Sequence, residues 1–128
     1  MEIKSILLVA AGGALGSVVR YLTVLKVNTV WASAFPWGTF TVNVLGCLII
    51  GFMAGLAERF ELITADARLL LFTGLMGGFT TFSAFGLETV QLMRKGELLI
   101  ASGYVLGSVV AGLLALWLGF IATQMLAK

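Results

Sequence analysis

The sequence reads Gly77-Gly78-Phe79-Thr80-Thr81-Phe82-Ser83-Ala84-Phe85 in the middle of an uncharged run that covers residues 69–87. Paired glycines weaken a helix, because each glycine costs about 1 kcal/mol relative to alanine. The hydroxyl groups of Thr80 and Thr81 can accept hydrogen bonds from the first amides of a new helix. The stretch therefore predicts a helix that unwinds near residues 77–80 and then restarts. An unbroken helix with a glycine-rich packing face is the alternative.

The composition of the whole chain places this run in a membrane. Apolar residues make up 60% of the 128 residues, charged residues make up 11%, and the mean hydropathy is +1.09. A soluble domain carries about 25% charged residues. The composition therefore excludes a soluble globular protein and indicates an integral membrane protein.

Four uncharged runs can cross a hydrocarbon core, which takes about 20 apolar residues in a helix. They predict helices at about residues 4–25, 36–57, 68–93 with the break near 77–80, and 97–127. The second helix starts near Pro36, because proline suits a first helical turn. We expect an all-α membrane protein in which residues 1–128 form one transmembrane domain and the third helix is broken at mid-membrane.

Several classes of function are excluded by the residues that the chain lacks. It has no histidine, so histidine-based catalysis and histidine metal sites are excluded, and its single cysteine, Cys47, forms no intrachain disulfide or thiolate metal cluster. The net charge of +2, without a basic run, gives no reason to expect nucleic-acid binding. No nucleophile–base pair is recognisable, so we do not expect an enzyme.

Positive charge is balanced between the two ends of the predicted bundle. Four crossings place Lys4, Arg59, Arg68 and Lys128 on one side of the membrane, and Lys26, Arg94, Lys95 and, if it reaches the surface, Arg20 on the other. The positive-inside rule therefore gives no orientation. Either the chains insert both ways and pair antiparallel, or a small protein simply shows no useful bias.

Small residues recur four positions apart on three of the predicted helices. The pairs are Gly12 with Gly16, Gly51 with Gly55, Gly103 with Gly107, and Ser108 with Gly112. Such faces let helix backbones approach closely in lipid. They can pack within one subunit or between subunits, and we expect a dimer.

Three predicted helices each carry a short polar or aromatic stripe. The stripes are Thr39 with Asn43, Tyr104 with Ser108, and Phe82 with Phe85 and Glu88. Amide and hydroxyl groups donate hydrogen bonds and phenyl rings have positive edges, so together they suit a small anion that passes quickly. Taken singly, a serine or threonine can instead bond its own backbone, and a phenylalanine pair can simply pack.

Arg20 lies near the end of the first predicted span, and two interpretations of it stay open. Its long side chain can snorkel to the membrane interface. It can also provide a fixed positive charge that attracts anions to the mouth of a pore.

Three motifs together resemble the Fluc (CrcB) fluoride channel family. They are Gly12-Gly13-Ala14-Leu15-Gly16 with Arg20-Tyr21, Trp37-Gly38-Thr39-Phe40-Thr41-Val42-Asn43, and the stretch 77–85 followed by Glu88. The resemblance runs through all four spans. The third motif, with its two phenylalanines, is specific, whereas the glycine motif of the first helix is weak by itself.

The resemblance implies a function and an assembly. It implies a fluoride-selective channel that passively exports toxic fluoride from the cytoplasm across the plasma membrane, the inner membrane of a bacterium. It also implies an antiparallel, dual-topology homodimer with two pores and a structural sodium ion (Na+) at its centre. The partners would be fluoride, sodium, membrane lipid and the second copy of the chain.

The resemblance also implies roles for individual residues. Phe82 and Phe85 look like the aromatic pair of the fluoride path, and Asn43 looks like its amide. Polar positions of the same path are matched by Ser108, Tyr104, Thr39, Ser83 and Glu88. Gly77 and Thr80 match the break whose backbone carbonyls hold sodium, and Arg20 matches the basic residue of the vestibule. Ala84 and Gly112 depart from the pattern, because relatives can carry hydroxyl residues there.

Two other functions are compatible with four short helices. A small dual-topology drug/proton antiporter needs a membrane-buried carboxylate, typically in the first helix. Here the first helix carries Arg20 and no acid, and Glu88 is placed at the end of a span. The second alternative is a non-transporting assembly subunit, in which the glycine faces serve packing alone.

Overall fold

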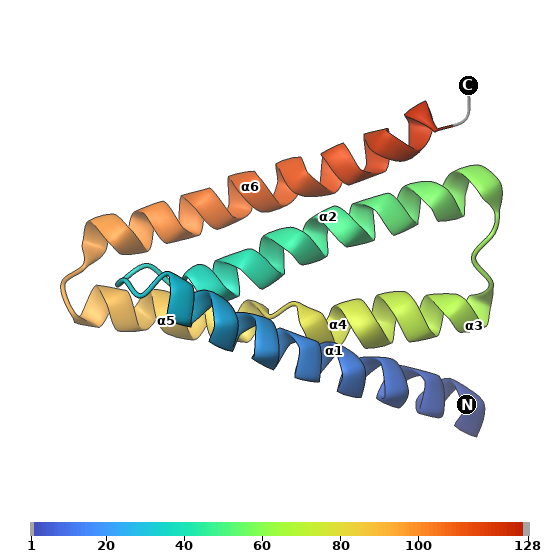
Figure 1. Ribbon diagram of the computed structural model, residues 1–128, viewed down its shortest axis with the longest axis horizontal. Coiled ribbons are helices and arrows are strands. Elements are labelled where there is room, and N and C mark those ends of the chain that lie inside the picture. The colour runs from blue at the N-terminus through green and yellow to red at the C-terminus, as the bar shows by residue number, and fades with distance from the viewer. Residues whose placement is uncertain (1, 127–128) are drawn as a thin grey trace.

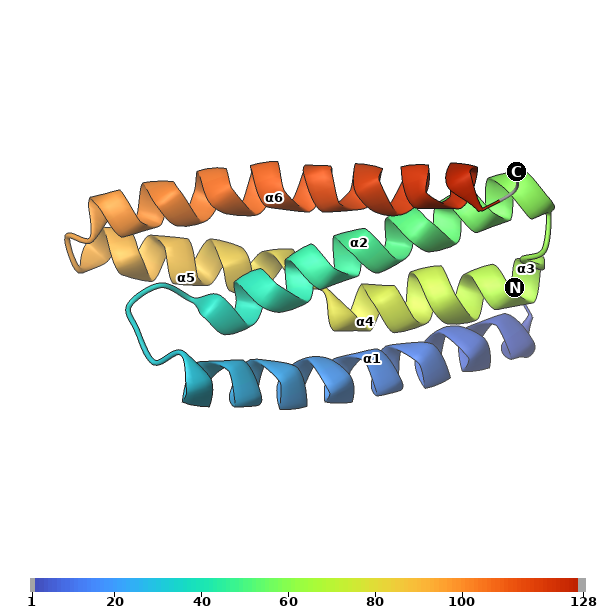
Figure 2. The same cartoon turned by 45° about the horizontal axis from the view of Figure 1, so that its top comes forward.

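The computed structural model describes residues 2–126, in which the regular elements are all helices joined by short non-helical segments, with no strand. Its elements are α1 (Ile3–Val30), α2 (Trp37–Phe60), α3 (Ala65–Arg68), η1 (Leu69–Met76), α4 (Gly77–Phe79), α5 (Phe82–Arg94) and α6 (Leu98–Met125). Within the described residues, four segments are long and apolar enough to cross a membrane: α1, α2, the third segment Ala65–Arg94, and α6. In both views α1 and α6 lie on the outside, with α2 and the third segment between them (Figure 1, Figure 2). The predicted all-α fold with four membrane-crossing helices is confirmed, and the chain is a multi-pass membrane protein.

The third segment is interrupted at Thr80 and Thr81. Both residues are extended, with φ −94° and ψ 156° at Thr80 and φ −151° and ψ 111° at Thr81. Helix α5 then starts at Phe82, and the Thr81 hydroxyl accepts a hydrogen bond from the Ala84 amide at 3.1 Å. A threonine side chain thus caps the second half of the broken helix, as the sequence predicts.

The paired glycines do not themselves unwind, which corrects the prediction of a break that begins at residue 77. Gly77 is helical, with φ −61° and ψ −38°, and the chain leaves the helix only at Thr80. Gly78 instead allows a close approach to α1, since a Cβ there would meet the Gly13 carbonyl and would come within 3.0 Å of the Ser17 amide. A glycine-rich packing face and a helix break therefore both occur, at adjacent positions.

Most of the predicted small-residue faces pack within the chain. A Cβ at Gly12 or Gly16 would overlap a carbonyl of η1, and a Cβ at Gly51 would overlap the Leu116 carbonyl of α6. At Gly103, in contrast, no atom of another element in the described chain comes within 4 Å of the Cβ position. The small-residue spacing alone therefore did not distinguish packing within the chain from an open face.

The first helix is longer than predicted, and this changes the place of Arg20. Helix α1 continues to Val30, five residues beyond the predicted end at residue 25, because no proline or glycine interrupts it before Trp31. Arg20 is half-buried and lies well inside the helix. The prediction that Arg20 lies near the end of its span is therefore wrong.

The remaining predicted bounds move by three residues or fewer at the ends that the structure describes. Helix α2 covers Trp37–Phe60 against a predicted 36–57, with Pro36 as its N-cap, and the third segment covers 65–94 against 68–93. Helix α6 begins at Leu98, and the predicted end at 127 lies outside the described residues. Because α5 continues to Arg94, Glu88 also lies inside its helix and not at the end of a span.

We expect different effects on stability from alanine at two glycines. Gly51→Ala should lower the thermal stability of the protein in detergent, because the added methyl group overlaps the Leu116 carbonyl and overpacking typically costs about 1–3 kcal/mol. Gly103→Ala, the matched control in open space, should leave the stability unchanged or raise it through helix propensity. Thermal unfolding followed by tryptophan fluorescence measures both variants, and equal stability of the two would contradict the packing described.

Candidate functional site

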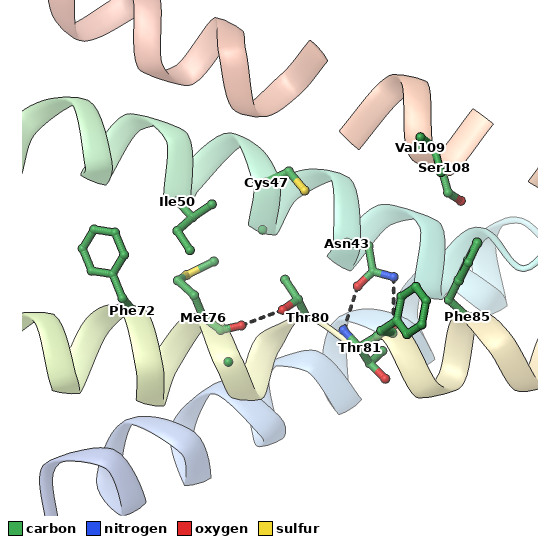
Figure 3. Close-up of a pocket in the computed structure, with 13 residues that line it drawn as sticks. Asn43, Cys47, Ile50, Phe72, Met76, Thr80, Thr81, Phe85, Ser108 and Val109 are labelled. Carbon is green, nitrogen blue, oxygen red and sulfur yellow. Dashed lines mark hydrogen bonds between the residues drawn. The ribbon is translucent and has the colours of Figure 1, made fainter. Parts of the chain in front are cut away.

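A groove of about 420 Å³ lies directly beside the break, between α2, the third segment and α6 (Figure 3). Its wall is mostly apolar, with Ile50, Phe72, Met76 and Val109 among the lining side chains. Its polar lining comes from Asn43, Thr80, Thr81 and Ser108, with the Cys47 thiol beside them. Apolar walls with a few convergent polar groups are typical of a ligand or ion site.

The two predicted aromatic residues meet in this groove. The ring centroids of Phe82 and Phe85 are 5.6 Å apart, with the ring planes inclined by 38°. Phe82 is 84% exposed in the single chain, whereas Phe85 is half-buried and packs on Tyr104 with centroids 5.1 Å apart. In a single chain the phenylalanine pair therefore lies at the surface, and only the Phe85 ring packs against another part of the chain, at Tyr104.

Asn43 binds the backbone of the break. Its Oδ1 accepts a hydrogen bond from the Thr81 amide at 2.8 Å, and its Nδ2 donates to the Thr81 carbonyl at 3.0 Å (Figure 3). An amide nitrogen carries two hydrogens, so one hydrogen of Asn43 remains for the groove that the residue lines. Asn43, a predicted path residue on α2, thus also holds the backbone of the break.

Ser108 provides an unused polar group in the groove. Its Oγ is buried and has no hydrogen-bond partner among the described residues. A buried hydroxyl without a partner is costly, so its presence calls for an explanation such as a bound ion or water. Ser108 is the one predicted path residue whose hydroxyl is both buried and unoccupied in the part of the chain that the structure describes.

Glu88, Thr39 and Tyr104 form a cluster next to the groove. The Thr39 hydroxyl donates to Glu88 Oε1 at 2.6 Å and the Tyr104 hydroxyl donates to Glu88 Oε2 at 2.8 Å. Thr39 and Tyr104 are buried, Glu88 is half-buried, and no ion pair of Glu88 occurs within residues 2–126. The carboxylate is therefore held by neutral donors, and Tyr104 links it to the groove through Phe85.

The structure brings most of the predicted site residues together and separates two. Asn43, Phe82, Phe85, Ser108, Gly77 and Thr80 line one groove, and Thr39, Glu88 and Tyr104 adjoin it. Ser83 is exposed and lies 3.4 Å from Thr81 by their hydroxyl oxygens, outside the lining. Arg20 lies on α1, one turn from Gly16, which packs against Leu75 and Phe79, and it does not line the groove.

Thr81 lines the groove, and the sequence reasoning left it out of the site. It donates to and accepts from Asn43 through its backbone, and its hydroxyl caps α5. The available signal was its position directly before Phe82, because a threonine that precedes a helix is a common cap. Its partner Asn43 lies 38 residues earlier, and no local pattern indicates that contact.

Backbone oxygens are the available cation ligands near the break. No group of three or more His, Cys, Asp or Glu residues that could hold a metal is found in the described part of the chain. In a continuous helix the Gly77 and Thr80 carbonyls would accept from the Thr81 and Ala84 amides. Those amides donate instead to Asn43 Oδ1 and Thr81 Oγ1, so both carbonyls lose their regular partners. Carbonyl oxygens suit a hard cation such as sodium.

Comparison with known proteins places this geometry in a family. A family model described as CrcB-like protein, Camphor Resistance (CrcB), matches residues 7–120. A protein of Methylobacillus flagellatus named Fluoride-specific ion channel FluC is 53% identical over 123 residues, which cover 94% of each chain.

Two further relatives carry the same name. The protein of Chlorobaculum tepidum is 50% identical over 125 residues, which cover 98% of each chain. The protein of Flavobacterium psychrophilum is 45% identical over 121 residues, which cover 94% of this chain and 98% of its own. The match of the family model over most of the chain, together with these nearly full-length similarities, shows that the chain belongs to the CrcB-like family.

Proposed function

We propose that the chain forms a fluoride-selective channel that passively exports fluoride from the cytoplasm and so relieves fluoride toxicity. The observation that carries the proposal is the groove in which the Phe82–Phe85 pair lies beside the Ser108 hydroxyl, which has no partner among residues 2–126. Three relatives with 45–53% identity are named fluoride-specific ion channels. The family is one of channels, and the chain is not an enzyme.

The groove offers what a small, strongly hydrated anion needs. Ser108 and the second hydrogen of Asn43 supply donors, and the edges of Phe82 and Phe85 supply positive electrostatic potential. No cationic side chain lines the groove among the described residues. Conduction requires sites that replace hydration water without holding the ion tightly, and neutral donors with ring edges meet that requirement better than a lysine or arginine would.

A second copy of the chain completes the proposed conduit. Phe82 is 84% exposed, and Gly77 and Ser83 are exposed beside it, so one wall of the path is missing in a single chain. The balanced cations at the two ends of the bundle give neither orientation an advantage. We therefore propose an antiparallel, dual-topology homodimer with two pores in the bacterial plasma membrane.

We further propose a structural sodium ion held by the Gly77 and Thr80 carbonyls at the centre of the dimer. The loss of the regular helical partners of both carbonyls supports it, because carbonyl oxygens freed at mid-membrane need a partner. A bound cation supplies positive charge at the middle of the membrane, where an anion is least stable. The Gly77 and Thr80 carbonyls could therefore hold a sodium ion without any carboxylate ligand.

Two substitutions in the groove should suppress fluoride flux while leaving the dimer intact. We expect Phe82→Ile and Asn43→Asp each to lower fluoride efflux from liposomes at least about tenfold, the factor that 1.4 kcal/mol represents. Isoleucine removes the positive ring edge, and aspartate replaces a donor by a group that repels the anion. Phe52→Ile, on a phenylalanine of α2 outside the groove, is the matched control and should conduct normally.

The same efflux measurement separates the competing functions. A passive fluoride leak supports the channel, proton-coupled cation uptake supports an antiporter, and no flux supports an assembly subunit. Helix α1 contains no Asp or Glu, which counts against the antiporter. Normal fluoride efflux in both groove variants would refute the assignment of Phe82 and Asn43 to the path.

Dual topology predicts that both ends of the bundle face the outside of the cell in part of the molecules. In a Cys47→Ala background, we expect Leu62→Cys and Lys95→Cys each to react incompletely with a membrane-impermeant maleimide on intact cells. These residues lie in the loops that join α2 to α3 and α5 to α6, at opposite ends of the bundle (Figure 1). Labelling of only one of the two positions would show a single orientation.

A further inference from the structure

Thr81 and Asn43 form a two-bond contact that a helix interior does not contain. Thr81 is extended, and its amide and carbonyl both bind the Asn43 side chain, at 2.8 and 3.0 Å (Figure 3). We propose that Asn43 is a positioning residue that holds the third segment open at Thr81 and thereby frees the Gly77 carbonyl for a cation. This inference rests on the cation site proposed above.

The asparagine side chain suits this task because of how an extended residue presents its backbone. The N–H and C=O of one extended residue point to the same side, as in a hydrogen-bonded pair of antiparallel strands. A carboxamide carries one acceptor and two donor hydrogens on adjacent atoms. Asn43 therefore occupies the place that a neighbouring strand would take, and it satisfies both Thr81 groups inside the membrane.

The contact competes directly with the helix. In a continuous helix the Thr81 amide would donate to the carbonyl four residues earlier, which is that of Gly77. The upstream helix does continue up to this point, since the Thr80 amide still donates to the Met76 carbonyl at 3.0 Å. The Thr81 amide is the first that does not donate to the carbonyl four residues earlier, and its acceptor is Asn43 Oδ1. The position of the break thus coincides with the amide that Asn43 binds.

Gly46 lets α2 come close enough for a short side chain to reach. It is buried, and a Cβ there would overlap the Thr80 side chain and lie 3.6 Å from the Phe79 ring. Gly46 follows Asn43 by three residues and shares its face of α2. The backbone of α2 therefore passes close to the break at Gly46. The short side chain of Asn43 can then reach Thr81, and no longer side chain is needed.

The two Gly-Gly pairs of the sequence allow a measurement at the Gly77 carbonyl itself. Protein grown with ¹³C-carbonyl glycine and ¹⁵N glycine has coupled labels only at Gly12-Gly13 and Gly77-Gly78. The Gly12 carbonyl lies inside α1 and serves as the internal reference. The NMR resonance of the Gly77 carbonyl is recorded in sodium chloride and in choline chloride, for the reconstituted full-length protein.

We expect the variants to divide by whether residue 43 keeps an acceptor for the Thr81 amide. In Asn43→Leu the Gly77 resonance should move downfield toward that of Gly12, and its difference between the two salts should disappear. In Asn43→Asp, which keeps an oxygen acceptor, the Gly77 carbonyl resonance should stay near its wild-type position even though fluoride flux is lost. The matched control Asn28→Leu removes a similar bond, from the Gly38 amide at 3.0 Å, and should leave Gly77 unchanged.

Two results would overturn the role of Asn43. One is a wild-type Gly77 resonance in Asn43→Leu, and the other is the same downfield shift in Asn43→Asp as in Asn43→Leu. If the wild-type protein shows no difference between the two salts, the cation part of the inference is wrong, while the shift in Asn43→Leu in choline still tests the helix break alone. Absence of fluoride efflux from wild-type liposomes would refute the channel function without changing the resonance.

Discussion

The membrane imposes one requirement on this fold: every backbone polar group that leaves a helix needs another partner, because lipid offers none. The third segment leaves its helix at Thr80 and Thr81 and meets this requirement in part, with side chains. Asn43 binds both backbone groups of Thr81, and the Thr81 hydroxyl binds the Ala84 amide. The groove, its aromatic pair and the freed carbonyls all lie around these three bonds, so their geometry depends on them.

The hydrogen-bond donors in and beside the groove divide into those already bonded within the chain and those still available. The hydroxyls of Thr39 and Tyr104 both donate to Glu88, so neither is a free donor in this arrangement. Ser108 Oγ, in contrast, is buried without a partner among the described residues. An anion in the groove would therefore first meet the Ser108 hydroxyl, the second amide hydrogen of Asn43 and the phenylalanine edges. It could recruit Thr39 or Tyr104 only by displacing a bond to the carboxylate.

Local signals predicted much of this structure, and contacts between distant residues account for what they missed. Charge-free runs located the four spans, Pro36 located the start of α2, and the threonines located the restart of the third segment. The prediction that the helix unwinds at Gly77 and Gly78 was wrong. Helix propensity alone cannot distinguish a glycine that loosens a helix from one that packs tightly against a neighbouring helix. Gly78 belongs to the second kind only because Gly13 and Ser17 of α1 lie against it. The hydrogen bonds of Asn43 to Thr81 likewise depend on how α2 crosses the break, which no spacing rule gives.

The exposed side of the break follows from the same requirement and gives the strongest physical reason for a second subunit. Gly77 is exposed in the single chain, and the amide that would have paired with its carbonyl is held by Asn43. A lipid tail provides neither a donor nor a charge to that carbonyl, so lipid contact there would leave a polar group unsatisfied at considerable cost. A second copy with a shared cation would satisfy the carbonyls of both chains at once. It would also cover Phe82, which is 84% exposed. The proposed dimer and the proposed cation would therefore both supply partners for the carbonyls freed at the break. Without a second subunit and its shared cation, the break would not be stable in lipid.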